Sequence, residues 1–145
     1  MPLHLIKLCV GVDTVRELVG YMRQRGRAAE KRGQPPRHAH VTRMTPTRGR
    51  DLVDGGSLYW VVRGQIAARQ RLVEIAPFVD AEGVSRCRLW VDAQVVKVVP
   101  RPMRPFQGWR YLRDEDAPPD LTTAGADIAL MPEAMRRELG QLGLL

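Results

Sequence analysis

The residue types best suited to chemistry in this chain are arginines and aromatic residues that lie close together in the sequence. Residues 101–111 read RPMRPFQGWRY, in which Phe106, Trp109 and Tyr111 alternate with Arg104 and Arg110. The prolines and the glycine of this segment exclude a continuous helix or strand ladder. Guanidinium groups bind phosphates and rings stack on bases, so the segment suits contact with a nucleic acid. The same rings could instead close one end of a hydrophobic core, and the sequence leaves both interpretations open.

Residues from other segments extend this candidate nucleic-acid surface. The guanidinium groups expected to neutralise phosphates are Arg43, Arg63, Arg69, Arg104 and Arg110. Rings available for stacking are Tyr59, Phe106 and Trp109, and the side chains able to hydrogen-bond a base edge are His40, Gln70 and Gln107. We therefore predict RNA or another polynucleotide, or more broadly an anionic ligand, as the partner of this protein.

The formal net charge of +7 is unevenly distributed along the chain. Residues 1–50 carry 11 Lys and Arg against 3 Asp and Glu, whereas residues 111–145 carry 3 against 7. This asymmetry indicates either an anionic partner for the first part of the chain or contact between its basic and acidic parts. A basic run in the first part is correspondingly either a solvated helix end or an anion-binding patch. Its members are Arg23, Arg25, Arg27, Lys31 and Arg32.

Motifs for catalysis, metals and cofactors are weak or missing in the sequence. In the run GGSLY at 55–59, a tyrosine stands where the serine-hydrolase elbow requires its second glycine, and Ser57 begins a strand pattern. His38 and His40 could lie on one face of a strand, but a metal site needs three or four ligands. No phosphate-binding glycine loop occurs. We therefore name no catalytic residue and expect no metal or cofactor.

Two other classes of function stay open beside nucleic-acid binding. A closed pocket containing His40 and Arg43 would favour a hydrolase acting on a small nucleotide-like or phospholipid-like substrate. An acidic C-terminal part lying over the basic first part would favour an assembly or scaffold module. The sequence leaves enzyme activity open, and binding is the preferred interpretation.

Strand patterns predict the elements that must position these residues. Residues 56–65 give the clearest pattern, with Leu58, Trp60 and Val62 on a core face and Tyr59 and Val61 on the opposite, partly polar face. Residues 3–10 are apolar at both parities, which predicts a strand covered on both sides. Residues 65–75 and 86–91 are expected to form a long hairpin, and shorter strands are expected at 38–44 and 94–99.

Helix signals are strongest near the start of the chain. Thr14 and Glu17 have the spacing of a capping box, and apolar residues follow at helical spacing, so we predict a helix over residues 14–32. One or two helical turns are expected within 48–54. A second helix is predicted over residues 132–145, beginning at Pro132.

The expected architecture is an α+β fold: a curved, mainly antiparallel sheet of five or six strands, or a partly open barrel, flanked by two helices. We expect a single domain over residues 1–145, composed of a core at 1–113, an acidic, proline-rich link at 114–131 and the C-terminal helix. No apolar run approaches the length of about 18 residues that crosses a bilayer, so we expect a cytoplasmic protein without a membrane partner. The oligomeric state is not predicted.

Several short strings together carry a resemblance to a known family. They are LIKLCVG at 5–11, HVTRM at 40–44, DGGSLYWV at 54–61, RQ at 69–70 and RPFQGWRYL at 104–112. The chain, up to Leu121, resembles the uncharacterised bacterial family named domain of unknown function 1489. Because that family has no established activity, the resemblance implies no catalytic or binding residue. The Tyr-Trp strand followed by basic positions is also similar to the PUA-like group of RNA-binding and modified-base-binding domains, which implies a small barrel.

Overall fold

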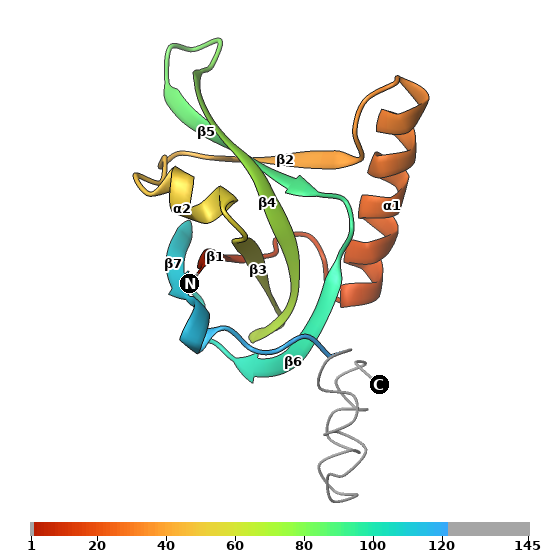
Figure 1. Ribbon diagram of the computed structural model, residues 1–145, viewed down its shortest axis with the longest axis vertical. Helices are drawn as coiled ribbons and strands as arrows, with labels where there is room; N and C mark the ends of the chain where they lie inside the picture. The colour runs from red at the N-terminus through yellow and green to blue at the C-terminus, as the bar shows by residue number, and fades with distance from the viewer. Residues whose placement is uncertain (1, 122–145) are drawn as a thin grey trace, which may run out of the picture.

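A curved sheet of seven strands forms the body of the molecule in the computed structural model, which describes residues 2–121 (Figure 1). In chain order the elements are β1 (Leu3–Leu8), α1 (Val15–Lys31), β2 (Arg37–Thr42), α2 (Gly49–Val53), β3 (Ser57–Val62), β4 (Gln65–Val79), β5 (Ser85–Asp92), β6 (Val96–Pro102) and β7 (Trp109–Arg113). A 3-10 turn, Asp114–Asp116, follows. The predicted α+β class is confirmed, with an open, curved sheet flanked by two helices. The two flanking helices are α1 and the short α2. The predicted helix over 132–145 lies outside the described residues.

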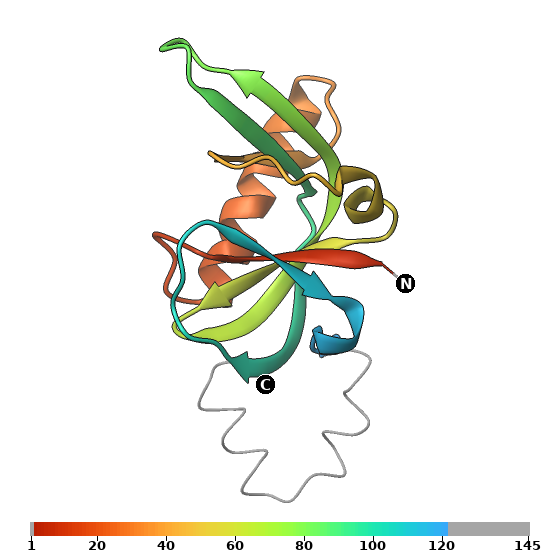
Figure 2. The same ribbon diagram turned by 90° about the vertical axis from the view of Figure 1, so that its left-hand side faces the viewer.

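The long strand β4 organises the sheet, whose order is β2-β5-β4-β3-β1-β7, with β6 also paired to β4. Along one edge β4 pairs with β3; along the other it pairs first with β6 and then with β5. Figure 2 shows β4 passing from the lower strands up into the β4–β5 hairpin, which the sequence predicted. Among residues 2–121, all strand pairings are antiparallel except that of β1 with β3, and the long connection between these two strands contains both helices.

Both faces of the central strands are buried, and each face meets a core of its own. Leu58 and Trp60 of β3 belong to a core that α1 covers with Leu18 and Met22. The opposite face of β3 forms a second core. Its buried members are Ile6, Tyr59, Val61, Ile66, Val98, Phe106 and Leu112. The prediction that one face of residues 56–65 is partly polar is therefore wrong, because β6, β7 and the loop between them cover that face.

The strand β7 was not expected from the sequence, which indicated irregular structure through Tyr111. It pairs antiparallel to β1, with Trp109 opposite Lys7 and Arg113 opposite Leu3. Its side chains also reach the loop between β2 and α2: the Trp109 indole N–H donates to the Met44 carbonyl at 2.8 Å. The Tyr111 hydroxyl accepts from the Thr47 backbone N–H at 3.0 Å. Side chains of β7 thus contact the loop that follows β2, the strand at the opposite edge of the sheet. No strand pairing between β2 and β7 closes the described sheet into a barrel.

The helix α1 begins where its capping residues predict. The Thr14 hydroxyl accepts from the Glu17 backbone N–H at 3.1 Å, and the Glu17 carboxylate accepts from the Asp13 N–H at 3.4 Å. Its buried stripe is Val15, Leu18, Met22, Gly26 and Ala29. The other helix positions are exposed except Val19, and five of them are basic, against two glutamates. In the described part of the chain, neither helix is long and apolar enough to span a membrane.

Candidate functional site

The arginine-rich segment at 101–111 packs the rings of Phe106 and Trp109 into the protein, whereas Tyr111 stays partly exposed. Phe106 and Trp109 are each 8% exposed, and Tyr59 is 4% exposed. The guanidinium group of Arg110 lies over the Phe106 ring, 4.6 Å from its centre, on the outer side. The predicted stacking role of Tyr59, Phe106 and Trp109 is therefore corrected, since burial of these rings in the two cores leaves no open aromatic face for a base.

The cationic residues of this region stay on the surface. The segment meets the β3–β4 turn through the Met103 backbone N–H, which donates to the Gly64 carbonyl at 2.9 Å. Arg63 and Gly64 form that turn with φ angles of 50° and 76°, the left-handed values that a two-residue hairpin requires. Both Arg63 and Arg104 are exposed at this end of the molecule. Arg43, Gln107 and Arg110 are also exposed.

Two other predicted contact residues have partners within the protein. Gln70 is fully buried; its side-chain oxygen accepts from the Trp60 indole N–H at 2.9 Å, and its amide donates to the Asp92 carbonyl at 2.8 Å. Arg69 forms two hydrogen bonds of 2.7 Å to the Asp120 carboxylate, which raise the pKa of its guanidinium above the ordinary value. The predicted base contact of Gln70 and phosphate contact of Arg69 are therefore corrected.

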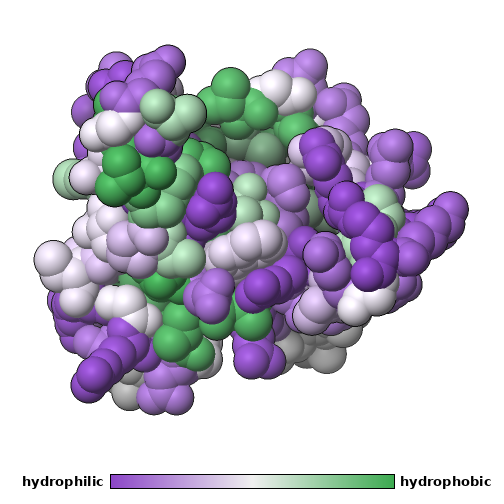
Figure 3. Space-filling view, turned by 90° about the horizontal axis from the view of Figure 1, so that it is seen from above, coloured by the Kyte–Doolittle hydropathy of each residue, from purple (hydrophilic) through white to green (hydrophobic). Residues whose placement is uncertain are grey.

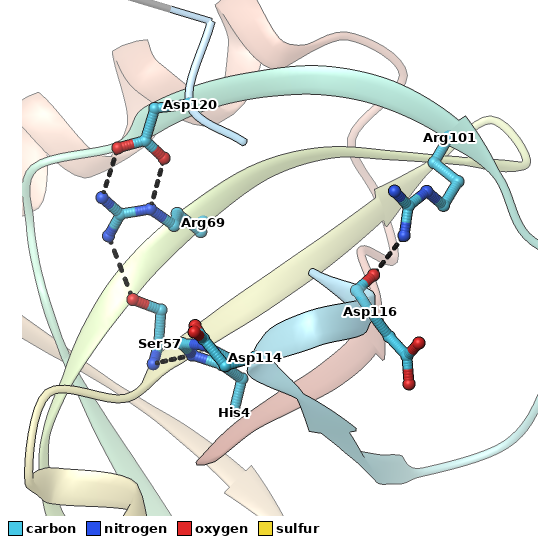
Figure 4. Close-up of polar contacts among 7 residues, drawn as sticks. All are labelled: His4, Ser57, Arg69, Arg101, Asp114, Asp116 and Asp120. Carbon is cyan, nitrogen blue, oxygen red and sulfur yellow. Dashed lines mark hydrogen bonds and ion pairs between the residues drawn. The ribbon is translucent and has the colours of Figure 1, made fainter. Parts of the chain in front are cut away.

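The contacts of Arg69 belong to a partly buried polar network (Figure 4). Its third hydrogen bond runs to the Ser57 hydroxyl at 3.0 Å, and the Ser57 backbone N–H donates to Nδ1 of His4 at 3.0 Å. Nε2 of His4 then donates to Asp114 at 2.8 Å. Because the backbone N–H occupies Nδ1, His4 is not placed to take a proton from the serine hydroxyl. His4, Ser57 and Asp114 therefore tie β1, β3 and the 3-10 turn together. They do not form a serine-hydrolase relay.

Further hydrogen bonds hold the first part of the predicted acidic link against the sheet. The Val99 backbone N–H donates to Pro119 and the Leu121 N–H donates to Lys97, both at 2.9 Å. Arg101 donates to the Asp116 carbonyl (Figure 4). Residues 114–121 are thus packed along β6 and are not a free surface connection. The remainder of the link lies outside the described residues.

A basic groove lies between the C-terminal end of α1 and β2. It encloses about 390 Å³. The polar and aromatic side chains that line it are Arg25, Arg32, Gln34, Arg37, His38 and Trp90. None of its lining residues is acidic, and the nearest carboxylate recorded for its cations is that of Glu74, 3.8 Å from Arg37. The groove therefore presents three guanidinium groups with little compensating charge.

Aromatic side chains orient two of these guanidinium groups. The guanidinium of Arg37 lies 4.2 Å from the centre of the Trp90 ring. The Nε of Arg25 donates to the Tyr21 hydroxyl at 3.1 Å, which leaves both of its terminal nitrogens available. Burial, and then the charge of Arg25, lower the pKa of the neighbouring His38. The positive charge of the groove therefore comes from its three guanidinium groups and not from His38.

The exposed face of α1 continues this basic surface beyond the groove. Within residues 2–121, no cation of α1 lies within 4.0 Å of a carboxylate. Hydrophilic side chains project along the side of the molecule that α1 forms, at the right of Figure 3. We define the α1 basic surface as this face together with the groove: Arg16, Arg23, Arg25, Arg27, Lys31, Arg32 and Arg37.

The family model described as "Protein of unknown function (DUF1489)" matches residues 5–145. The chain belongs to the DUF1489 family. No curated protein and no solved structure matches it. The resemblance carried by the short sequence strings is thereby confirmed, and in this DUF1489 domain it extends past Leu121 to the end of the chain.

Part of the groove of this DUF1489 domain was visible in the sequence and part was not. The basic run that includes Arg25 and Arg32 gave a direct signal, which left an anion-binding patch as one of two interpretations. Arg37 and Trp90 gave none, because their contact depends on strand register. Ala39 lies opposite Trp90 in the β2–β5 pairing, so Arg37, two residues earlier on the same face, becomes its diagonal neighbour.

His40, predicted to contact a base edge, faces the protein interior. Its ring centre lies 4.5 Å from that of Trp60 and 4.8 Å from that of His38. Its Nε2 is buried and has no hydrogen-bond partner among the described residues. Burial is the main cause that lowers the pKa of His40 to about 3, with smaller effects from the charges of His38 and Lys7. Among residues 2–121, no three potential ligands are grouped to hold a metal ion.

The depressed pKa of His40 predicts a specific pH dependence of stability. The unfolded chain binds a proton at this residue near pH 6.5, whereas the folded protein does so only near pH 3. The folded state therefore loses stability as the pH falls from 6.5 towards 3, by up to about 1.4 kcal/mol per pH unit. We expect His40→Leu to remove this loss. The free energy of unfolding of the wild type should therefore fall relative to that of the variant between pH 6.5 and 4.5. Urea unfolding across that range measures it, and parallel pH profiles of the two proteins would contradict it.

Proposed function

We propose that this DUF1489 domain binds RNA or another polynucleotide through the α1 basic surface. The observation that carries the proposal is the set of exposed cations on α1 and at its end, together with the half-buried Arg37, which alone among them has a carboxylate within 4.0 Å in the described residues. Cations of this kind neutralise phosphates and supply affinity that does not depend on sequence. The buried rings of Tyr59, Phe106 and Trp109 are not part of the proposed surface.

The dimensions of α1 suit a polynucleotide. A helix of 17 residues is about 25 Å long, since each residue adds about 1.5 Å. One strand of a duplex carries a phosphate about every 3.4 Å along its axis, so α1 can lie beside several phosphates at once. The open shape of the helix face admits a long ligand, in contrast to the closed cavity that a small-molecule hydrolase needs.

Binding of mixed-sequence RNA at two salt concentrations tests this function. We expect a labelled 20-nucleotide single strand to bind at about 50 mM salt, and to bind about 100-fold more weakly at about 200 mM if five phosphates are contacted. Fluorescence anisotropy measures both affinities, and a duplex of the same sequence is measured alongside. Absence of binding at the lower salt concentration, or affinity that does not change with salt, would contradict the proposal.

A further inference from the structure

We infer that the groove between α1 and β2 is a site for a phosphate monoester, carried by the terminal nucleotide of the bound strand. This inference rests on the proposed function and assigns one part of the α1 basic surface a distinct ligand. The groove differs from the rest of that surface because it is lined on several sides. Its walls come from α1, the loop that follows α1, β2 and β5.

The charge of the groove fits a monoester better than an internal phosphate. A terminal phosphate monoester carries about −1.5 to −2 at neutral pH, whereas a phosphodiester within a strand carries a single negative charge. The groove offers the guanidinium groups of Arg25, Arg32 and Arg37, and no carboxylate lines it. Three cations gain more from a dianion than from a monoanion, and bidentate guanidinium contacts add direction to that attraction.

The orientation of the groove's side chains lowers the entropic cost of binding. Arg37 rests on the Trp90 ring, and Arg25 is held by both the hydroxyl and the ring of Tyr21. These two guanidinium groups therefore lose less conformational freedom when a phosphate arrives than unsupported surface arginines would lose. The hydrogen bond of Arg25 uses its Nε and leaves the paired terminal nitrogens for the ligand.

The size and walls of the groove admit the nucleoside as well as the phosphate. A volume of about 390 Å³ lies in the range of small-ligand sites, and Ala29, Pro35, Ala39 and Trp90 provide apolar contact. An internal nucleotide would have to enter and leave through the same open side. A terminal nucleotide is joined to the rest of the strand on one side only, so a single backbone segment has to pass through the opening. The groove therefore favours a strand end.

Oligonucleotides that differ only at their ends test the inference. Three RNA strands of one sequence are compared, carrying a 5′-phosphate, a 3′-phosphate or hydroxyl groups at both ends. We expect one phosphorylated strand to bind about tenfold more tightly than the hydroxyl strand. Arg37→Gln, and separately Arg25→Gln, should bring this ratio close to one, and circular dichroism confirms that each variant is folded. The matched change Arg23→Gln, on the helix face outside the groove, should weaken all three strands and keep the ratio.

The outcomes separate this inference from the proposed function. Equal affinity for all three strands would overturn the phosphate-monoester site while supporting polynucleotide binding. Binding of adenosine 5′-monophosphate without binding of any strand would support the groove as a monoester site and overturn its terminal-nucleotide assignment. Absence of binding for the monophosphate and for every strand would overturn both.

Discussion

Reversing two charges in the groove, by Arg25→Glu with Arg32→Glu, is expected to weaken single-stranded RNA binding by about 100-fold at low salt. Each substitution removes one phosphate contact and adds a repulsive carboxylate, and each is worth about tenfold in affinity. The dependence of log affinity on log salt should also become shallower by about 1.4, since about 0.7 is lost per contact with a single strand. Anisotropy titrations at three or more salt concentrations measure both effects.

A control variant makes the same change of charge at the β3–β4 turn and the adjoining β6–β7 loop, by Arg63→Glu with Arg104→Glu. These exposed arginines lie outside the α1 basic surface and were part of the surface predicted from the sequence. We expect this control to weaken RNA binding by no more than about threefold, through the change in long-range potential alone. If the control lost as much affinity as the groove variant, or more, the binding surface would be the one that the sequence indicated.

The substitution Gly56→Ala is expected to destabilise the fold by about 4 kcal/mol or more. A Cβ atom at this position would stand 2.1 Å from the Leu3 carbonyl oxygen and 2.3 Å from that of Leu52. Both contacts are with backbone atoms, so neither can be relieved by a rotamer change. Gly56 also donates to the Leu52 carbonyl and accepts from the Leu72 N–H, at 2.9 and 3.0 Å. The backbone would therefore have to move where β1, α2 and β4 meet.

Urea unfolding followed by circular dichroism measures this effect, and Gly20→Ala provides the matched control. Gly20 lies within α1, and an added Cβ there meets no atom within 4 Å. Alanine at an exposed helical position is favoured over glycine, so we expect this control to stabilise the protein by about 0.5–1 kcal/mol. A Gly56→Ala variant within about 1 kcal/mol of the wild type would contradict the packing described for this junction.

Local patterns predicted much of this fold correctly. The capping residues of α1, the doubly buried β1 and the β4–β5 hairpin each depend on neighbours within a few residues or on simple periodicity. The second core and β7 could not be predicted in this way. They depend on the curvature of the sheet and on contacts such as that of Trp109 with Met44, which are 65 residues apart.

The contacts of the candidate site residues could be predicted less well, for a related reason. The sequence identified arginines and rings correctly as residue types but could not show which of them have partners. Arg69 is neutralised by Asp120, 51 residues later, and Phe106 enters a core that forms only when β6 and β7 are in place. Conversely, the basic run on α1 has the local pattern of an ordinary solvated helix. The proposal that it binds an anion rests on Arg37 and Trp90, which strand register brings beside it.

An NMR titration of the full chain with a short single-stranded RNA tests the central claim most directly. As RNA is added, we expect the largest changes at the backbone amides of residues 23–34 and 37–38 and at the indole N–H of Trp90, which line or adjoin the α1 basic surface. The indoles of Trp60 and Trp109, which are buried and hydrogen-bonded within the protein, should change little. Changes confined to residues 63–64 and 101–110, with none at 23–38, would contradict the account.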